Sequence, residues 1–193
     1  MSKNFTRYAF TDSVKQAQSR YGTRNAYARI EQSGDKYRLG ARETLFIQAR
    51  DSFYIATTGD NGWPYVQFRG GERGFLKTIS DTTLGYADFR GNGQYISTGN
   101  IEENGKACLI LMDYPNKERL KIWAESTIIE ADDNPELRKA LELPDYPGQI
   151  ERLVTFRIEA FDWNCPRHIT PRYTVDEVRM LVSDEAAIFR IDE

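Results

Sequence analysis

The sequence has few of the side chains that usually bind metals. It contains one histidine and two cysteines among 193 residues. Cys108 and Cys165 form no CxxC pair, so a closed zinc site would need both of them to meet His168 and a carboxylate. We therefore expect no metal site. Cys108 lies in the apolar run ACLILM and is predicted to be a core residue.

Long apolar runs and an excess of one charge sign are also missing. No apolar run approaches membrane-spanning length, and the opening residues MSKNFTRYAFTDS have no apolar centre of the kind found in signal peptides. The 26 Lys and Arg residues nearly balance the 29 Asp and Glu residues, which leaves a net charge of −3. We therefore expect a cytoplasmic protein that binds neither a membrane nor nucleic acid.

Two familiar nucleotide-binding motifs are missing as well. The sequence has no Walker A motif and no G-x-G-x-x-G, which argues against a P-loop or Rossmann domain. What is present favours one domain with a sizeable core, because 40% of the residues are apolar and they include 11 Tyr, 10 Phe and 3 Trp.

Residues 1–50 are predicted to be a helical cover. The segment FTDSVKQAQSRYG has Thr11 or Asp12 as its candidate N-cap and a glycine at its C-terminal end. A further helix is expected in GARETLFIQARD, with Leu45 and Phe46 pointing inward. These helices have too few apolar positions to form a core of their own.

Residues 51–173 have the alternation of β-strands. SFYIATTG, the turn DNG and WPYVQFRGG predict a hairpin, and GFLKTI, TLGYADF, KACLILMDY, RLKIWAESTIIE and LVTFRIEAFDW are further strand-like segments. One helix is inserted near 134–143, with Asn134 as N-cap and Pro135 at its first position. Residues 174–193 are predicted to be a helical tail. Six or seven strands with hairpin-length turns predict an antiparallel barrel or sandwich, mainly β with flanking helices.

The segment DFRGNGQYISTGN, residues 88–100, is rich in glycine and short polar side chains. Free backbone N–H groups between Gly91 and Gly93, with the guanidinium of Arg90 beside them, suit a phosphate. The alternative is an irregular hairpin loop in which the glycines supply positive φ. The residues alone do not decide between these interpretations.

The segment PYVQFRGGERG, residues 64–74, ends a strand. Strand alternation places Gln67 and Arg69 on one face and Phe68 on the other. A polar pair on an inner face needs partners, which a planar heterocycle with carbonyl and imide groups would supply. The alternative is that the pair faces solvent.

The segment DWNCPRHITPRY, residues 162–173, follows a strand and holds the single histidine and one cysteine. Two prolines restrict its backbone, while Asn164, Arg167 and His168 supply hydrogen-bond donors. No orienting third residue for a cysteine–histidine nucleophile can be identified. A polar lid over a ligand, or a contact between subunits, fits this composition better.

These segments, in this order, resemble the pyridoxamine 5′-phosphate oxidase-like family of flavin-binding split barrels, in its flavin-nucleotide-binding branch. The resemblance covers roughly residues 40–173 and rests on FYIATTGDNGWPYVQFRGG, on LGYADFRGNGQYISTGNI with EENGKACLILMDY behind it, and on DWNCPRHI. It implies an antiparallel six-stranded split β-barrel that forms a homodimer. It also implies FMN in clefts shared by the two subunits.

The resemblance also implies roles for the three segments. The strand YVQFRGG would contact the flavin ring and ribityl chain, YADFRGNGQYIS would hold the phosphate, and DWNCPRHI would reach the flavin from the other subunit. The implied cofactor-binding residues are Val66, Gln67, Phe68, Arg69, Gly70, Ala87, Asp88, Arg90, Gln94, Tyr95, Ser97, Asn164, Arg167 and His168.

This sequence departs from the family pattern at the phosphate site, so the activity of the oxidase is not assigned to it. The oxidase holds its phosphate with a paired Arg-Lys, and the corresponding place here reads GQYIS. We therefore expect an FMN-dependent oxidoreductase of unknown substrate, with a small molecule or a nicotinamide as reaction partner, rather than oxidation of pyridoxamine phosphate. His168 is the one candidate proton donor. The alternatives are a non-catalytic flavin carrier or sensor, and the same barrel binding a deazaflavin or haem.

Overall fold

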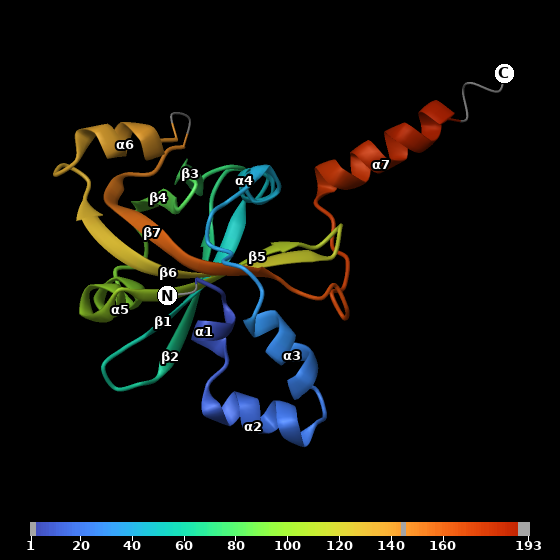
Figure 1. Cartoon of the computed structure of the whole chain (residues 1–193). Coiled ribbons are helices and arrows are strands. Elements are labelled where there is room, and N and C mark those ends of the chain that lie inside the picture. Colours follow the sequence, from blue (N-terminus) through green and yellow to red (C-terminus); the bar gives the residue numbers. More distant parts are fainter. Residues whose placement is uncertain (1–2, 144–145, 189–193) are drawn as a thin grey trace.

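The computed structural model of the chain describes residues 3–143 and 146–188. In these ranges, four helices precede the strands, one lies between the fourth and fifth strands, one between the sixth and seventh, and one follows the seventh (Figure 1). The helices are α1 (Thr6–Ala9), α2 (Asp12–Arg20), α3 (Arg24–Glu31), α4 (Ala41–Gln48), α5 (Ile96–Asn104), α6 (Pro135–Leu141) and α7 (Val175–Ile188). The end of the predicted tail, residues 189–193, lies outside the described residues.

Within the described residues, seven strands form one antiparallel sheet in the order β2-β1-β5-β6-β7-β4-β3. The strands are β1 (Ser52–Thr58), β2 (Pro64–Gly70), β3 (Lys77–Ser80), β4 (Thr83–Phe89), β5 (Lys106–Asp113), β6 (Glu118–Glu130) and β7 (Ile150–Trp163). The expected number of six is therefore wrong. Each of the seven strand-like segments of the sequence forms a strand, including the short edge strand β3, which a tight turn places beside β4.

The sheet curls around the main core, and in the described residues its two edge strands are not paired with each other. Phe53 on β1, Tyr86 on β4 and Phe156 on β7 pack together, with ring centroids 5.6–6.2 Å apart. Because β1 and β4 are distant in the strand order, these contacts require strong curvature. Side chains, and not hydrogen bonds between strands, join the two ends of the sheet.

The segment around α1 packs on the outer face of the sheet at β6 and β7, and α2 and α3 extend from it. Thr11 caps α2 by accepting a hydrogen bond from the N–H of Val14, as the sequence predicts. Phe5 stacks on Trp123 of β6 with centroids 5.8 Å apart. Cys108, predicted to be in the core, is only half-buried. It lies on this outer face because the flanking residues on β5 point inward.

Helix α4 packs against the core through Phe46 and Ile47. The expectation that Leu45 points inward is wrong, because this side chain is 67% exposed. On a helix the residue one turn before Phe46 shares its face, and here that residue is Glu43. Its carboxylate accepts a hydrogen bond from the indole of Trp163 at 2.8 Å.

Helices α6 and α7 differ in how they meet the sheet. Helix α6 begins where the sequence predicts, with Asn134 accepting from the N–H of Leu137 and Pro135 at the first position. Its Leu141 packs against β4 and β7. Helix α7 instead projects away from the sheet (Figure 1). None of the helices in the described ranges is long and apolar enough to span a bilayer.

Candidate functional site

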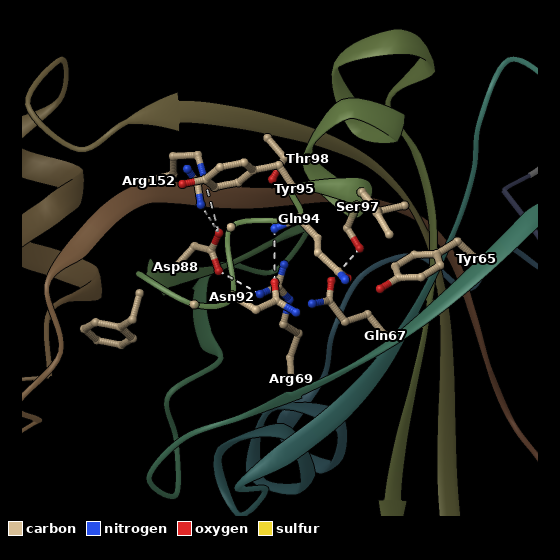
Figure 2. A pocket seen from close by; sticks show the side chains of 14 residues that line it. Tyr65, Gln67, Arg69, Asp88, Asn92, Gln94, Tyr95, Ser97, Thr98 and Arg152 are labelled. Atoms are coloured by element: carbon tan, nitrogen blue, oxygen red, sulfur yellow. Dashed lines mark hydrogen bonds and ion pairs between the residues drawn. The ribbon is translucent and has the colours of Figure 1, made fainter.

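A pocket of about 230 Å³ lies between β2, the end of β4, the start of α5 and the first residues of β7. Figure 2 shows the side chains that surround it. The residues of β2 that line it are Tyr65, Gln67 and Arg69, which share the inward face of the strand. The predicted alternation of this strand is confirmed, since Phe68 between them is 58% exposed on the opposite face.

The glycine-rich segment forms one wall of the pocket and then becomes a helix. Gly93 has φ +73° and Tyr95 has φ 52°, and together they turn the chain from β4 into α5. The side chain of Asn92 stabilises the turn by accepting a hydrogen bond from the N–H of Gln94 at 3.2 Å. The segment is thus both a turn, as its glycines suggest, and part of a pocket.

Helix α5 itself is not predicted from the sequence. Its N-cap residue, Tyr95, offers no side-chain hydrogen bond, and Gly99 lies inside the helix. Both features weaken the usual sequence signals of a helix start. The first turn, Ile96 to Thr98, lines the pocket, and no side chain caps it. Backbone N–H groups in such a turn favour an anion.

A buried carboxylate next to this turn is shared by two guanidinium groups. Asp88 on β4 is 4% exposed, and its Oδ1 accepts from Nη1 of Arg69 at 2.9 Å. Its Oδ2 accepts from Arg152 on β7, at 3.0 Å from Nη2 and 3.3 Å from Nε. These contacts hold both guanidinium groups at the pocket wall before any ligand arrives (Figure 2).

The charge state of this cluster is well defined. Burial alone would lower the pKa of Arg152, but its hydrogen bond and ion pair with Asp88 outweigh that effect and raise the pKa. Burial also raises the pKa of the Tyr86 phenol, and the charge of Asp88 adds to this. Arg152 is therefore charged and Tyr86 neutral near neutral pH.

One hydrogen bond and one unpaired donor characterise the wall of the pocket on the side of β2. The hydroxyl of Ser97, which is 2% exposed, donates to Oε1 of Gln67 at 2.7 Å. This bond fixes the amide of Gln67, so that its N–H₂ end remains available. Within the described residues, the buried Nε of Arg69 has no hydrogen-bond partner. A buried donor without a hydrogen bond lowers the stability of the fold by about 1–3 kcal/mol. An acceptor on a ligand would remove this cost.

A second pocket, also of about 230 Å³, adjoins the first and shares Arg69, Asp88 and Phe89 with it. Its other walls come from the end of β2, from β4 and from Tyr146. The Arg69–Asp88 ion pair lies where the two pockets meet. A ligand longer than either pocket would therefore pass beside this ion pair.

The structure brings most of the residues implied by the resemblance into these two pockets. The residues that line the first pocket are Gln67, Arg69, Asp88, Gln94, Tyr95 and Ser97. Those that line only the second are Phe68, Gly70, Ala87 and Arg90. Val66 lines neither and is 61% exposed on the outward face of β2.

Asn164, Arg167 and His168 lie elsewhere. They follow β7, whose first residues, including Arg152, are at the pocket and whose last residue is Trp163. At roughly 3.3 Å per residue, the strand measures about 35 Å along its curved path between Arg152 and Trp163. Within one chain these three residues and the pocket are therefore at opposite ends of β7.

The sequence interpretation missed several lining residues, of which Arg152 is the most important. It lies in the segment QIERLVTF, whose alternation predicts an amphipathic strand. In such a strand a polar residue at this position is expected, so the sequence gives no sign of a site. Only the pairing of β7 with β4 places it opposite Asp88. No cluster of three His, Cys, Asp or Glu side chains that could hold a metal ion is found in the part of the chain that the structure describes.

Comparisons with known proteins identify the fold. No protein-family model and no curated protein sequence matches this chain. A candidate pyridoxamine 5′-phosphate oxidase from Lactobacillus delbrueckii is 20% identical and matches with a TM-score of 0.52, over 66% of this chain and 95% of its own. HupZ of Group A Streptococcus is 14% identical, with a TM-score of 0.51 over 70% of this chain and all of its own.

A third match is an FMN-binding protein from Syntrophomonas wolfei. It is 15% identical and gives a TM-score of 0.50 over 63% of this chain and 82% of its own. At these identities the likeness concerns the arrangement of the strands, which agrees with the curled antiparallel sheet described above. The chain has the split-barrel fold of the pyridoxamine 5′-phosphate oxidase-like proteins.

Proposed function

We propose that this chain binds FMN and acts as a flavin-dependent oxidoreductase whose substrate is a small molecule. The observation that carries the proposal is the first turn of α5, which no side chain caps and which lies in one pocket with Arg69 and Arg152. Backbone N–H groups and guanidinium groups in one pocket suit a phosphate dianion. The split-barrel fold and its FMN-binding neighbour support the same ligand.

The residues present fit the rest of FMN. Gln67, oriented by Ser97, offers amide hydrogen bonds of the kind that the carbonyl and imide edge of a flavin ring requires. The unpartnered Nε of Arg69 would find an acceptor on the ligand. When bound, the flavin would supply the redox chemistry, taking up two electrons from a donor and passing them to a substrate. The chain's own residues would bind, orient and shield it.

The exposed face of β2 supports a homodimer. Beside the pocket, the outward face of β2 exposes Val66 and Phe68, next to Trp63, which is 76% exposed. Such an apolar patch is typical of a surface that another protein covers. A second copy on this face would enlarge the cleft and bury the patch.

The proposed dimer also gives a role to the loop after β7. Asn164, Arg167 and His168 lie too far from the pocket of their own chain to reach it. In the dimer the loop of one subunit would close the cleft of the other, and His168 would be available as a proton donor beside the flavin. Replacing His168 by Ala tests this role, and unchanged rates of flavin reduction and reoxidation would remove it.

The experiment that tests the cofactor is an absorption spectrum of the freshly purified protein, followed by mass spectrometry of whatever acid releases. We expect the two absorption bands of a flavin and the mass of FMN. A colourless protein that also fails to bind added FMN would refute the proposal. A deazaflavin would be distinguished by its different spectrum and mass. Haem would need His168 as a ligand, and this residue lines neither pocket.

A non-catalytic flavin carrier or sensor is the second candidate function. It is favoured by the ionisable side chains of the first pocket, which are two tyrosines, two paired arginines and the paired Asp88. None of these is an obvious proton donor or acceptor at neutral pH. Stopped-flow mixing with NADH and NADPH separates the two functions, because a carrier would show no catalysed reduction of its flavin with either nucleotide.

A further inference from the structure

We propose that Arg152 is the guanidinium that recognises the phosphate of the ligand, and that Asp88 is the residue that positions it. This inference rests on the proposed function and specifies which side chain replaces the Arg-Lys pair of the oxidase. Neither Arg152 nor β7 is part of the segments that resemble the family's phosphate site, so the assignment comes from the tertiary structure alone.

The first step concerns the place of Arg152. It is paired directly with Asp88 across the β4–β7 ladder, so the two side chains lie on the same face of the sheet. Its side chain is 12% exposed, and it contacts Asp88 and Glu151 at 3.0 and 2.9 Å. A long side chain with these fixed contacts loses little further freedom when it binds a ligand.

The second step concerns the distance to helix α5. The guanidinium of Arg152 lies over the ring of Tyr95, 4.7 Å from its centroid, and Tyr95 is the residue immediately before α5. Figure 2 shows Arg152 beside this ring, with Asp88 below it. Arg152 and the first helical turn, Ile96 to Thr98, also line the same pocket. An oxyanion placed there would meet both kinds of donor.

The third step excludes the competing arginines. Arg90, the arginine within the glycine-rich segment, is 71% exposed and does not line the first pocket. Arg69 reaches the opposite oxygen of Asp88 from β2, where the two pockets meet. Its place suits the middle of a long ligand and not the end that lies at α5.

The fourth step concerns the role of Asp88. Two guanidinium groups and the carboxylate of Asp88 line the pocket, and Glu151 pairs with Arg152 from the side. Asp88 bonds Arg69 with one oxygen and Arg152 with the other, which holds the two cations in fixed places. Without Asp88, the two cations would take other orientations. Asp88 is therefore a positioning residue, which acts on the phosphate through Arg152.

The test compares FMN with riboflavin, which has the same ring and ribityl chain but no phosphate. Dissociation constants are measured by flavin fluorescence quenching for the full-length apo-protein, for Arg152→Gln and for Arg157→Gln as matched control. Arg157 lies on the same strand, is half-exposed and pairs with Glu125 away from the pocket. Arg152→Lys and a melting curve of each variant establish whether the fold is retained.

We expect Arg152→Gln to weaken FMN binding about 10- to 100-fold and to change riboflavin binding less than threefold. Arg152→Lys should recover part of the loss, and Arg157→Gln should bind both flavins as the parent does. Asp88→Asn should also lower the preference for FMN over riboflavin.

Equal losses of FMN and riboflavin in a folded Arg152→Gln variant would overturn the inference, as would selective loss of FMN in Arg90→Gln instead. In both cases the parent protein still binds FMN, so the proposed function would stand. If the parent binds neither flavin, the proposed function and this inference fail together. If Arg152→Gln does not fold, the other two variants decide. A preference for FMN over riboflavin that is unchanged in both Arg152→Lys and Asp88→Asn would overturn the inference.

Discussion

Asp88 and Arg152 face each other across β4 and β7, and Asp88 shares its two oxygens between Arg152 and Arg69. The three side chains connect β2, β4 and β7, which come from distant parts of the sequence. The same cluster therefore closes the curled sheet at one end and forms the wall of the candidate flavin pocket. Stability and the proposed ligand binding would therefore depend on the same contacts.

The shared carboxylate should contribute strongly to stability. Asp88→Asn leaves the buried guanidinium of Arg69 without an anion and leaves Arg152 only Glu151, and we expect the free energy of unfolding to fall by about 3 kcal/mol. Urea denaturation measures this change. Asp132→Asn is the control, because Asp132 is 93% exposed and pairs with Arg138 at the surface, and its loss should cost less than about 1 kcal/mol. Equal losses for the two variants would contradict the role given to Asp88.

The hydroxyl of Ser97 should matter for both stability and flavin binding. Ser97→Ala removes a buried bond to Gln67 and should lower the free energy of unfolding by about 1 kcal/mol. It should also weaken binding of FMN and riboflavin alike, because the amide of Gln67 is no longer fixed toward the ring. Ser19→Ala removes a hydroxyl bond on the exposed face of α2 and serves as control. Selective loss of FMN alone would place Ser97 at the phosphate instead.

Added FMN should stabilise the apo-protein. A ligand that binds only the folded state contributes about 2.7 kcal/mol at one hundred times its dissociation constant, which corresponds to roughly 5–10 °C in melting temperature for a chain of this length. Differential scanning fluorimetry at several FMN concentrations measures the shift, with adenosine monophosphate as a phosphate-bearing control. A melting temperature that does not respond to FMN would argue against the pocket.

The exposed face of β2 should form the proposed subunit interface. Phe68→Asp places a charge on this face and should convert a dimer to a monomer, as measured by light scattering after size-exclusion chromatography. Leu45→Asp is the control, because Leu45 is equally apolar and 67% exposed but lies on α4. Monomerisation by the Leu45 variant, with the Phe68 variant still a dimer, would move the interface to α4.

Asp113 should make stability depend on acid pH. Burial alone would raise the pKa of Asp113, but hydrogen bonds from Asn116 and the ion pair with Arg50 at 2.8 Å outweigh it and lower the pKa. The group therefore stabilises the fold at neutral pH, and this contribution is lost as the pH falls below about 4. Asp113→Asn should be less stable than the parent at pH 7, and the difference should shrink at pH 3. A difference that stays constant between the two pH values would contradict this assignment.

Local sequence signals predicted several elements correctly. Thr11, Asn134 and Pro135 mark helix starts because their side chains or fixed φ satisfy the first turn without help from other parts of the chain. The alternation of Gln67, Phe68 and Arg69 also needs only the geometry of a strand. Helix α5 was missed because its start has no capping side chain, and Leu45 was misplaced because the inward face of α4 depends on what the helix packs against.

The antiparallel β character, the flanking helices and the glycine-rich turn could be predicted from the residues alone, because these features follow from alternation, capping residues and backbone freedom. Which strands pair could be seen only once the chain was folded. The tertiary structure sets β7 against β4, which places Arg152 beside Asp88, and it leaves Asn164 and His168 at the far end of β7. Strand order depends on how apolar faces pack over long sequence separations, and a local pattern carries no information about that packing.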